Sequence, residues 1–439
     1  MIEALRNSFR LPDLRNKLLY TLLILVVYQF AAHVPVPGVN RDALTALFSS
    51  EGAGLINVLN LLSGGAVSNF SVIANGVYPY ITATIIMQLL TPIIPQLEAI
   101  QREPGGTDKL NQYSYYLAIP MAALQSYGQI NIFSSLAGGQ QIIEGFGSDP
   151  LITISTLFTM TAGTMFAIWL GELITEQGIG QGLSIIIFSG IVAQVPFNLG
   201  RLILNSPNAL YSVAVFVVLT VITVLVIVVV QEGTRRIPVQ YGKRVRGRKI
   251  YGGGSTHIPL RVNTAGMIPL IFAQSFITFP AILASLFPPG PLGDTIRDTF
   301  GNQSGFTYWF VYFLFVVGFT YFYTDVMVQN QNLAENLQRQ GGFIPGIRPG
   351  KRTQDYITHV VRRITLVGAL FLGGVAVLPG VVQVLDGLLF PGTAATGFSS
   401  NPALVISSAG LIIVVGVVID TMRQLEAQLV MRNYESFMR

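Results

Sequence analysis

The strongest constraint on this chain is a series of long apolar segments that recurs from one end to the other. Its 439 residues are 51% hydrophobic and only 11% charged, whereas soluble proteins carry about 25% charged residues. A helix needs about 20 mostly apolar residues to cross a membrane. We therefore predict an all-α, polytopic membrane protein whose ten transmembrane helices cover residues 18–32, 72–95, 115–135, 151–170, 183–199, 211–230, 265–287, 308–328, 364–382 and 403–419.

The chain contains no cysteine, so it forms no disulfide and offers no thiolate chemistry. Its first 17 residues are charged and amphipathic, and the apolar run that follows lacks an obvious small-residue cleavage site. We expect residues 1–17 to form a short helix on the cytoplasmic surface of the membrane, and not a cleaved signal peptide.

Lysine and arginine are distributed unevenly between the loops, which predicts the orientation of the chain. All but three of the 26 Lys and Arg residues fall on the side that holds both termini. The three on the other side are Arg41, Arg201 and Arg297. Because basic loops remain in the cytoplasm, we expect both termini to be cytoplasmic.

The ten spans divide into two sets of five, in residues 1–200 and 201–439. An odd number of spans in each half gives the halves opposite orientations, as in inverted repeats around a site at the middle of the membrane. The halves share no convincing residue-level similarity, so the inverted repeat around a central pore is a hypothesis.

A short apolar run between glycines precedes the second span. Residues 55–62 are too few to cross a membrane, and the flanking glycines allow the segment to fold back and to move. The pattern favours a stopper, or plug, beside a pore, with a re-entrant loop or an amphipathic surface turn as alternatives. Asn57 and Asn60 either form hydrogen bonds at the pore or face the external funnel. The residues assigned to the plug are Gly54, Leu55, Ile56, Asn57, Val58, Leu59, Asn60, Leu61, Leu62 and Gly64.

Two cytoplasmic loops, at residues 231–263 and 329–363, are too large to be simple connectors. In the first, Ile237, Val239 and Tyr241 alternate with polar residues, which predicts a basic β-hairpin. The second is rich in glycine and proline, which predicts rigid turns. The loops either serve only orientation and attraction to anionic lipid, or dock a large acidic partner such as ribosomal RNA. The candidate docking residues are Arg236, Lys243, Arg244, Arg248, Lys249 and Arg348.

The residue patterns of common catalytic sites are absent. There is no Gly-x-x-x-x-Gly-Lys-Ser/Thr phosphate loop, and His33, His257 and His359 are scattered. We expect no enzyme activity, no metal and no cofactor. Ion-coupled transporters usually keep ionisable groups at mid-membrane, whereas every span here is apolar or neutral polar at its middle. A secondary transporter for a small solute is therefore the rival class.

Isoleucines recur at helical spacing within the spans. Ile81 and Ile85 are four residues apart, as are Ile187 and Ile191, so each pair shares a helix face. Isoleucine is equally common on lipid-facing and core helices. A ring of branched apolar side chains nevertheless excludes water and ions by dewetting, and it yields around a polypeptide. The candidates for such a pore ring are Ile81, Ile85, Ile187, Ile191, Ile277 and Ile413.

Seven separate runs of residues are specific enough to indicate a family. They are PYITATIIMQLL at 79–90, GTMF at 163–166, WLGE at 169–172, GIGQGLSIIIF at 178–188, STHIPL at 255–260, FIPGIRPG at 343–350 and YES at 434–436. In these runs, and over essentially its whole length, the chain resembles the SecY family, the central subunits of the bacterial protein-conducting channel.

The resemblance implies a passive conduit in the bacterial plasma membrane. Such a conduit moves secretory polypeptides across the membrane and releases transmembrane segments sideways into lipid. It also implies that the six isoleucines form the ring of the pore and that residues 52–65 form the plug. A lateral gate would lie between the second and third spans on one side and the seventh and eighth on the other, with polar candidates Gln88, Thr91, Gln125, Gln274 and Ser275. The implied partners are the SecE and SecG subunits, the SecA motor ATPase, the ribosome, and precursors of secretory and membrane proteins.

Overall fold

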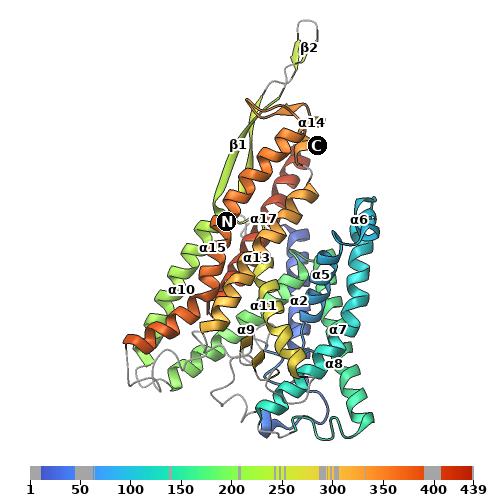
Figure 1. The fold of residues 1–439 in the computed structure, drawn as a ribbon, viewed down its shortest axis with the longest axis vertical. Coiled ribbons are helices and arrows are strands. Elements are labelled where there is room, and N and C mark those ends of the chain that lie inside the picture. Colours follow the sequence, from blue (N-terminus) through green and yellow to red (C-terminus); the bar gives the residue numbers. More distant parts are fainter. Residues whose placement is uncertain are drawn as a thin grey trace.

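The computed structural model describes residues 11–44, 63, 65–137, 141–205, 209–241, 244–246, 249–251, 254–285, 293, 295–296, 299–300, 306–331, 333–389 and 407–437. Within them, one long helix overlaps each of the ten predicted spans (Figure 1). These helices are α2 (Pro12–Ala31), α5 (Tyr78–Leu90), α7 (Gly106–Leu136), α8 (Pro150–Gln177), α9 (Gly182–Asn205), α10 (Ala209–Glu232), α11 (Ile268–Ser285), α13 (Phe306–Gln331), α15 (Lys351–Leu389) and α17 (Ser407–Phe437). The prediction of a helical fold is confirmed.

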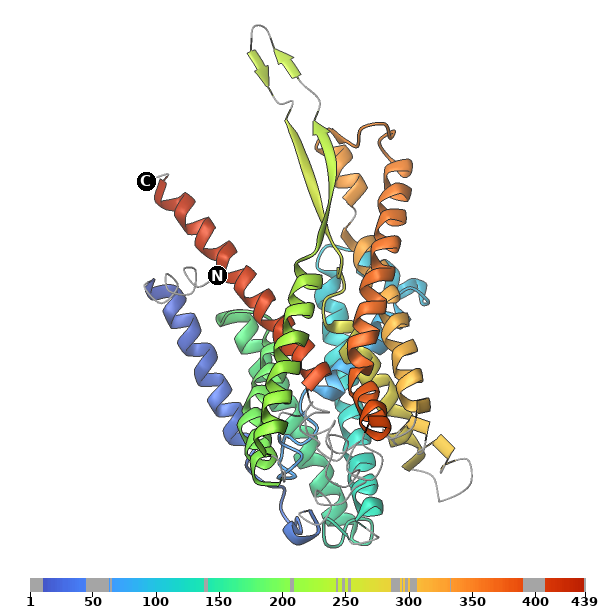
Figure 2. The same cartoon turned by 90° about the vertical axis from the view of Figure 1, so that its left-hand side faces the viewer.

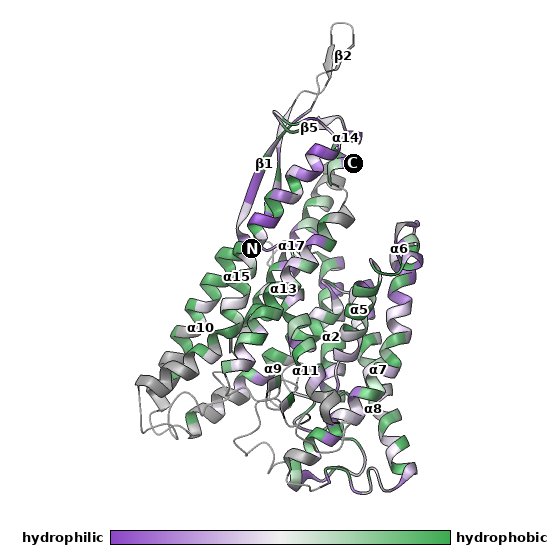
Figure 3. Ribbon diagram, in the orientation of Figure 1, coloured by the Kyte–Doolittle hydropathy of each residue, from purple (hydrophilic) through white to green (hydrophobic). Residues whose placement is uncertain are grey.

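Length and composition single out some of these helices as membrane spans. In the described part of the chain, four helices are long and apolar enough to cross a membrane by themselves: Pro12–Ala31, Pro150–Gln177, Phe306–Arg339 and Lys351–Leu378. Hydrophobic residues dominate the bundle, and hydrophilic residues gather at the end that carries the strands (Figure 3). This distribution is typical of a polytopic membrane protein.

The second predicted span is not one straight helix. Helix α5 begins at Tyr78 instead of residue 72, and the chain bends by 104° before α6 (Pro95–Arg102). Pro92 and Pro95 explain the break, because proline lacks the N–H group that a continuing helix needs. With 13 residues, α5 is about 20 Å long, which is shorter than the hydrocarbon core of about 30 Å. Mostly buried turns over residues 65–77 precede it.

The predicted basic hairpin is present and projects beyond the helices (Figure 2). Ile237 and Val239 are buried, whereas Arg236 and Gln240 are exposed, as the period of two along a strand requires. Ile237 pairs with Ile258 in the antiparallel register. The four strands of the hairpin are β1 (Thr234–Tyr241), β2 (Arg244–Arg246), β3 (Lys249–Tyr251) and β4 (Ser255–Arg261).

A fifth strand, the third of the sheet that contains β1 and β4, joins this hairpin to the second large loop. The sequence pattern does not reveal this strand. Strand β5 (Gly342–Phe343) pairs with β1, so the order is β4-β1-β5. The two loops and the start of α15 also share one buried apolar cluster: Ile237, Val239, Leu260, Ala334, Leu337, Ile344, Ile357 and Val361. The two loops are therefore one folded body, here called the hairpin unit, which consists of β1–β5, α14 (Leu333–Arg339) and residues 344–361.

The helices pack around a central apolar cluster. Helix α5 lies against α7 and α11, and α13 lies between α11 and α15. On the other side, α10 packs against α9 and α17, and α2 packs against α8. The cluster draws buried side chains from α2, α8, α9, α10, α11, α13, α15 and α17, so both halves of the sequence contribute to it.

Candidate functional site

Four of the candidate ring isoleucines lie together in the central cluster. Ile187 and Ile191 come from α9, Ile277 from α11 and Ile413 from α17. Each is at most 3% exposed. The structure thus places isoleucines from both halves of the sequence in one apolar core.

Helix α5 supplies the other two candidates. Ile81 is partly buried and packs against the central cluster and against a second cluster beside it. Ile85 belongs to that second cluster, with Phe272 and Tyr323. The six isoleucines therefore do not share one cluster, and Ile85 is connected to the others through Ile81.

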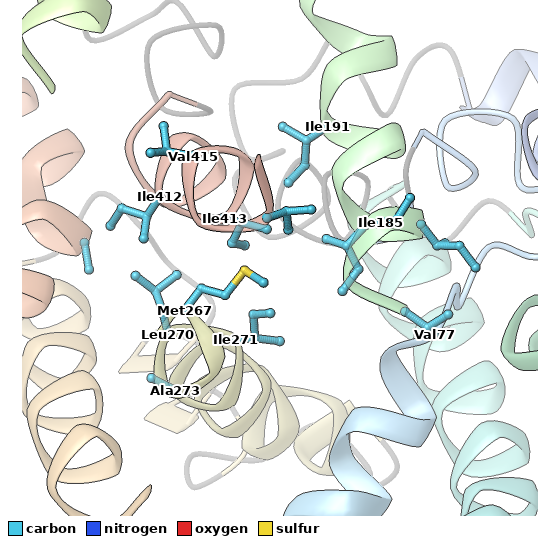
Figure 4. Packing of buried hydrophobic residues seen from close by; sticks show 14 of the residues in the cluster. Val77, Ile185, Ile191, Met267, Leu270, Ile271, Ala273, Ile412, Ile413 and Val415 are labelled. Carbon is cyan, nitrogen blue, oxygen red and sulfur yellow. The ribbon is translucent and has the colours of Figure 1, made fainter. Parts of the chain in front are cut away.

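Two further residues complete the centre, and the sequence pattern alone did not mark them. In Figure 4, Ile191 and Ile413 extend into the same space as Met267, directly before α11, and Ile271 in the first turn of α11. Met267 and Ile271 are buried in the central cluster. Their spacing of four residues is the helical signal that would have found them.

The centre contains no charge. Among the residues whose burial is described, no Asp, Glu, Lys, Arg or His side chain is buried. The buried polar side chains are Ser, Thr, Asn and Gln, together with the hydroxyl groups of tyrosines such as Tyr28 and Tyr312. In the described part of the chain, no group of three or more His, Cys, Asp or Glu residues is placed to hold a metal ion. Among the described residues, the core thus places no charged side chain where ion-coupled transporters usually keep one.

The ten residues assigned to the plug lie outside the described residues. Two positions at the end of the run, Ser63 and Gly65, are described. The buried Tyr28 hydroxyl of α2 donates a 3.0 Å hydrogen bond to the Ser63 carbonyl. Gly65 has a φ of +89°, and a Cβ at this position would meet the Gln194 side chain of α9 at 3.0 Å. This end of the run is therefore held between α2 and α9.

The candidate gate residues lie on α5, α7 and α11 or directly after α5. Gln125 of α7 donates a 3.2 Å hydrogen bond from Nε2 to the Thr82 hydroxyl of α5. Thr91 donates to the Met87 carbonyl of its own chain segment. Gln88 keeps a buried side-chain oxygen that accepts no hydrogen bond among the described residues. Gln274 and Ser275 are buried on α11.

Helices α5 and α11 are joined by a residue that was not among the gate candidates. The Tyr78 hydroxyl, at the start of α5, donates a 2.7 Å hydrogen bond to the backbone carbonyl of Ser275 on α11. The two residues are 197 positions apart in the chain. No local signal in the sequence pairs them, so only the fold brings them together.

The candidate docking residues fall on the hairpin unit. Arg236 on β1 and Arg348 after β5 are exposed. Arg244 and Lys249 lie on β2 and β3, whereas Lys243 and Arg248 are outside the described residues. The Arg348 carbonyl accepts a 2.9 Å hydrogen bond from the Thr353 hydroxyl, which ties its turn to α15.

Two ion pairs connect the base of the hairpin with α17. Arg423 of α17 contacts Glu232, at the end of α10, at 2.8 Å. Asp420 of α17 lies 3.9 Å from Arg261 at the end of β4. Because α17 also carries Ile413, the hairpin base and the central cluster meet on one helix.

Comparisons with known proteins agree with the motifs. The SecY family model matches residues 71–422. The protein translocase subunit SecY of Halalkalibacterium halodurans is 41% identical over the full length of both chains. The SecY subunit of Thermus thermophilus is 39% identical, and the match covers 100% of this chain and 98% of the Thermus sequence. That of Bacillus subtilis is 41% identical over both full lengths.

Solved structures show the same architecture. A protein-conducting channel superposes with a TM-score of 0.63 at 18% identity, covering 94% of this chain and 92% of its own. Sec61 from a canine ribosome–channel complex superposes with a TM-score of 0.61 at 17% identity, with the same coverage.

The fold of the chain and its central core together define a polytopic helical membrane protein with an uncharged apolar centre. The chain belongs to the SecY family of protein translocase subunits. The resemblance in the seven sequence runs is thereby confirmed. Members of this family are subunits of a protein-conducting channel and not enzymes.

Proposed function

We propose that this chain forms the pore through which extended secretory polypeptides cross a bacterial plasma membrane. The observation that carries the proposal is the uncharged cluster of Ile187, Ile191, Ile277 and Ile413 between the two halves. Branched apolar side chains seal against ions by dewetting. They bind no particular sequence, so they part around a passing chain and close behind it.

The proposed topology follows from the basic residues. The hairpin unit and both termini lie in the cytoplasm, and residues 1–200 and 201–439 are the two inverted halves. Residues 52–65 act as the plug on the opposite side. The hydrogen bond from Tyr28 of α2 to the Ser63 carbonyl supports this, because it fixes one end of that segment, and Gly65 beside it lies close to Gln194 of α9.

Transport in this proposal is passive and driven by a partner. The SecA motor or a translating ribosome docks on the basic hairpin unit, and the SecE and SecG subunits complete the channel. The merging of both loops into one unit supports docking, because Arg236 and Arg348 are then held on one body. Phosphate groups of ribosomal RNA match the positive charge of this surface.

A second exit leads sideways. Apolar segments of about 20 residues leave into lipid between α5 and α7 on one side and α11 and α13 on the other, stabilised there by roughly 0.3–0.6 kcal/mol per leucine-like residue. The buried residues Gln125, Gln274 and Ser275 and the partly buried Gln88 support a gate here, because polar groups weaken the packing of helices that must separate.

Cysteine crosslinking tests the pore. Because the chain has no native cysteine, Ile187→Cys introduces a single reactive site in the centre. We expect a stalled secretory precursor that carries a crosslinker to react with this cysteine. Val192→Cys on the same helix, where the native side chain is 42% exposed, is the matched control and is expected to stay unlabelled. Equal labelling at both positions, or uptake of a small solute without any precursor crosslink, would favour the rival transporter.

Charge reversal tests the docking surface. Arg348→Glu replaces an attraction by a repulsion, and a charge-assisted contact contributes about 1.5–3 kcal/mol. We expect partner-driven translocation to slow by about tenfold or more, with normal insertion of the variant into the membrane. Arg41→Glu makes the same charge change on the other side of the membrane and should leave the rate unaltered. Translocation at the native rate by Arg348→Glu would remove this residue from the docking site.

A further inference from the structure

The hydroxyl group of Tyr78 links α5 to α11. The contact between these two helices, one from each half of the chain, is here called the seam. Its hydrogen bond to the Ser275 carbonyl is short, at 2.7 Å, and both residues are buried. A buried hydroxyl that loses its acceptor finds no water to replace it, so breaking this bond costs more than breaking one at the surface. The contact therefore opposes separation of α5 from α11.

The position of this bond is as informative as its geometry. Ser275 precedes Phe276, which is 41% exposed, and Ile277, which is buried in the central cluster. Within three residues α11 thus passes from the outer surface to the core. The bond from Tyr78 lies where a segment moving from the core toward lipid would have to separate the two helices.

Other hydrogen bonds of the seam act differently. The bond between Gln125 and Thr82 joins α7 to α5, which both belong to the first half. The bond of Thr91 returns to Met87 in its own segment. The Ser275 hydroxyl forms no hydrogen bond among the described residues. These side chains make the seam polar, but the bonds they form here do not hold α5 to α11.

We propose that Tyr78 is the latch of the lateral gate and sets how apolar a segment must be to open it. This inference rests on the proposed sideways exit. An entering segment must supply, through its own contact with lipid, the free energy lost when the latch breaks. Tyr78→Phe keeps the ring and removes the donor, which should shift the closed–open balance toward the open gate by about 2- to 10-fold.

The first test measures the export of precursors whose signal segments range from weakly to strongly hydrophobic. Complete translocase carrying Tyr78→Phe is compared with the unaltered protein on precursors whose signal segments differ only in hydrophobicity. We expect export of the weakest signal to rise by about 2- to 10-fold, with little change for the strongest. Tyr116→Phe removes an exposed hydroxyl from α7 and should give no gain. A uniform loss for all signals, or an equal gain from Tyr116→Phe, would overturn the latch.

A second measurement does not depend on transport. Leu89 of α5 and Ile268 of α11 pack against the same apolar cluster, and cysteines at both positions report on the seam through a short bifunctional reagent. In resting translocase without precursor, Tyr78→Phe should lower the crosslinking yield, whereas Tyr116→Phe should not. An unchanged yield refutes the latch. A lower yield with unchanged export of weak signals keeps the latch and refutes the sideways exit as the step that reads signal hydrophobicity.

Discussion

Replacing Ile187 and Ile413 together with serine is expected to raise the resting ion leak through the protein by about tenfold or more. Each isoleucine is buried at the centre, and burial of such a side chain contributes about 1.5–3 kcal/mol. Serine lowers the free energy of the hydrated state of the constriction, so water and ions enter more often. The leak is measured as ion flux from vesicles that contain the purified translocase.

The control for this prediction uses the same two helices. Val192 of α9 and Val418 of α17 are 42% and 45% exposed. A Val192→Ser, Val418→Ser double variant therefore makes a similar chemical change on faces turned away from the centre. We expect its leak to match that of the unaltered protein. If both double variants leak equally, or neither leaks, the apolar centre does not form the seal.

Gly163→Ala is expected to lower the stability of the folded protein by about 1–3 kcal/mol or more. Gly163 lies on α8, and an added Cβ would overlap the backbone carbonyl of Val72. Because the overlapping atom belongs to the backbone, it cannot rotate away as the tip of a side chain would. Val72 belongs to the buried turns before α5, so the strain falls on the segment that positions Tyr78. Thermal denaturation of the purified protein measures the effect.

A second glycine in a transmembrane helix provides the comparison. A Cβ at Gly318, on α13, would meet no atom within 4 Å. Gly318→Ala should be neutral or stabilising by up to about 1 kcal/mol, because alanine favours the helix over glycine. Equal melting temperatures for the two alanine variants would contradict the close approach of α8 to Val72. Glycine is therefore needed at position 163, the first residue of the GTMF run, because the backbone at Val72 leaves no space for a side chain on α8.

The sequence predicted most of the architecture because its signals are local. Apolar runs placed all ten long helices, and alternation of Ile237, Val239 and Tyr241 placed the hairpin. The interruption of the second span was missed, although Pro92 and Pro95 mark it. A hydropathy window averages over such a break, and only the backbone shows the 104° turn.

The candidate site was predictable in residue type but not in arrangement. Ile187 and Val192 are both apolar residues of α9, and nothing in their local sequence tells which one faces the core. The family resemblance selected Ile187, and the structure buries it in the central cluster. It also places Ile85 in a neighbouring cluster and adds Met267 and Ile271 to the centre. Whether a side chain faces the core depends on which helices surround it, and those helices come from distant parts of the chain.

Sequence by itself therefore determined that the chain is a helical membrane protein, where its helices lie, and which family it belongs to. In lipid each segment must satisfy its own backbone hydrogen bonds, so helix formation follows from local composition. Only the tertiary structure decided which isoleucines meet at the centre, that two loops form one hairpin unit, and that Tyr78 reaches Ser275. These contacts join residues far apart in sequence, and their energies come from packing that no single segment encodes.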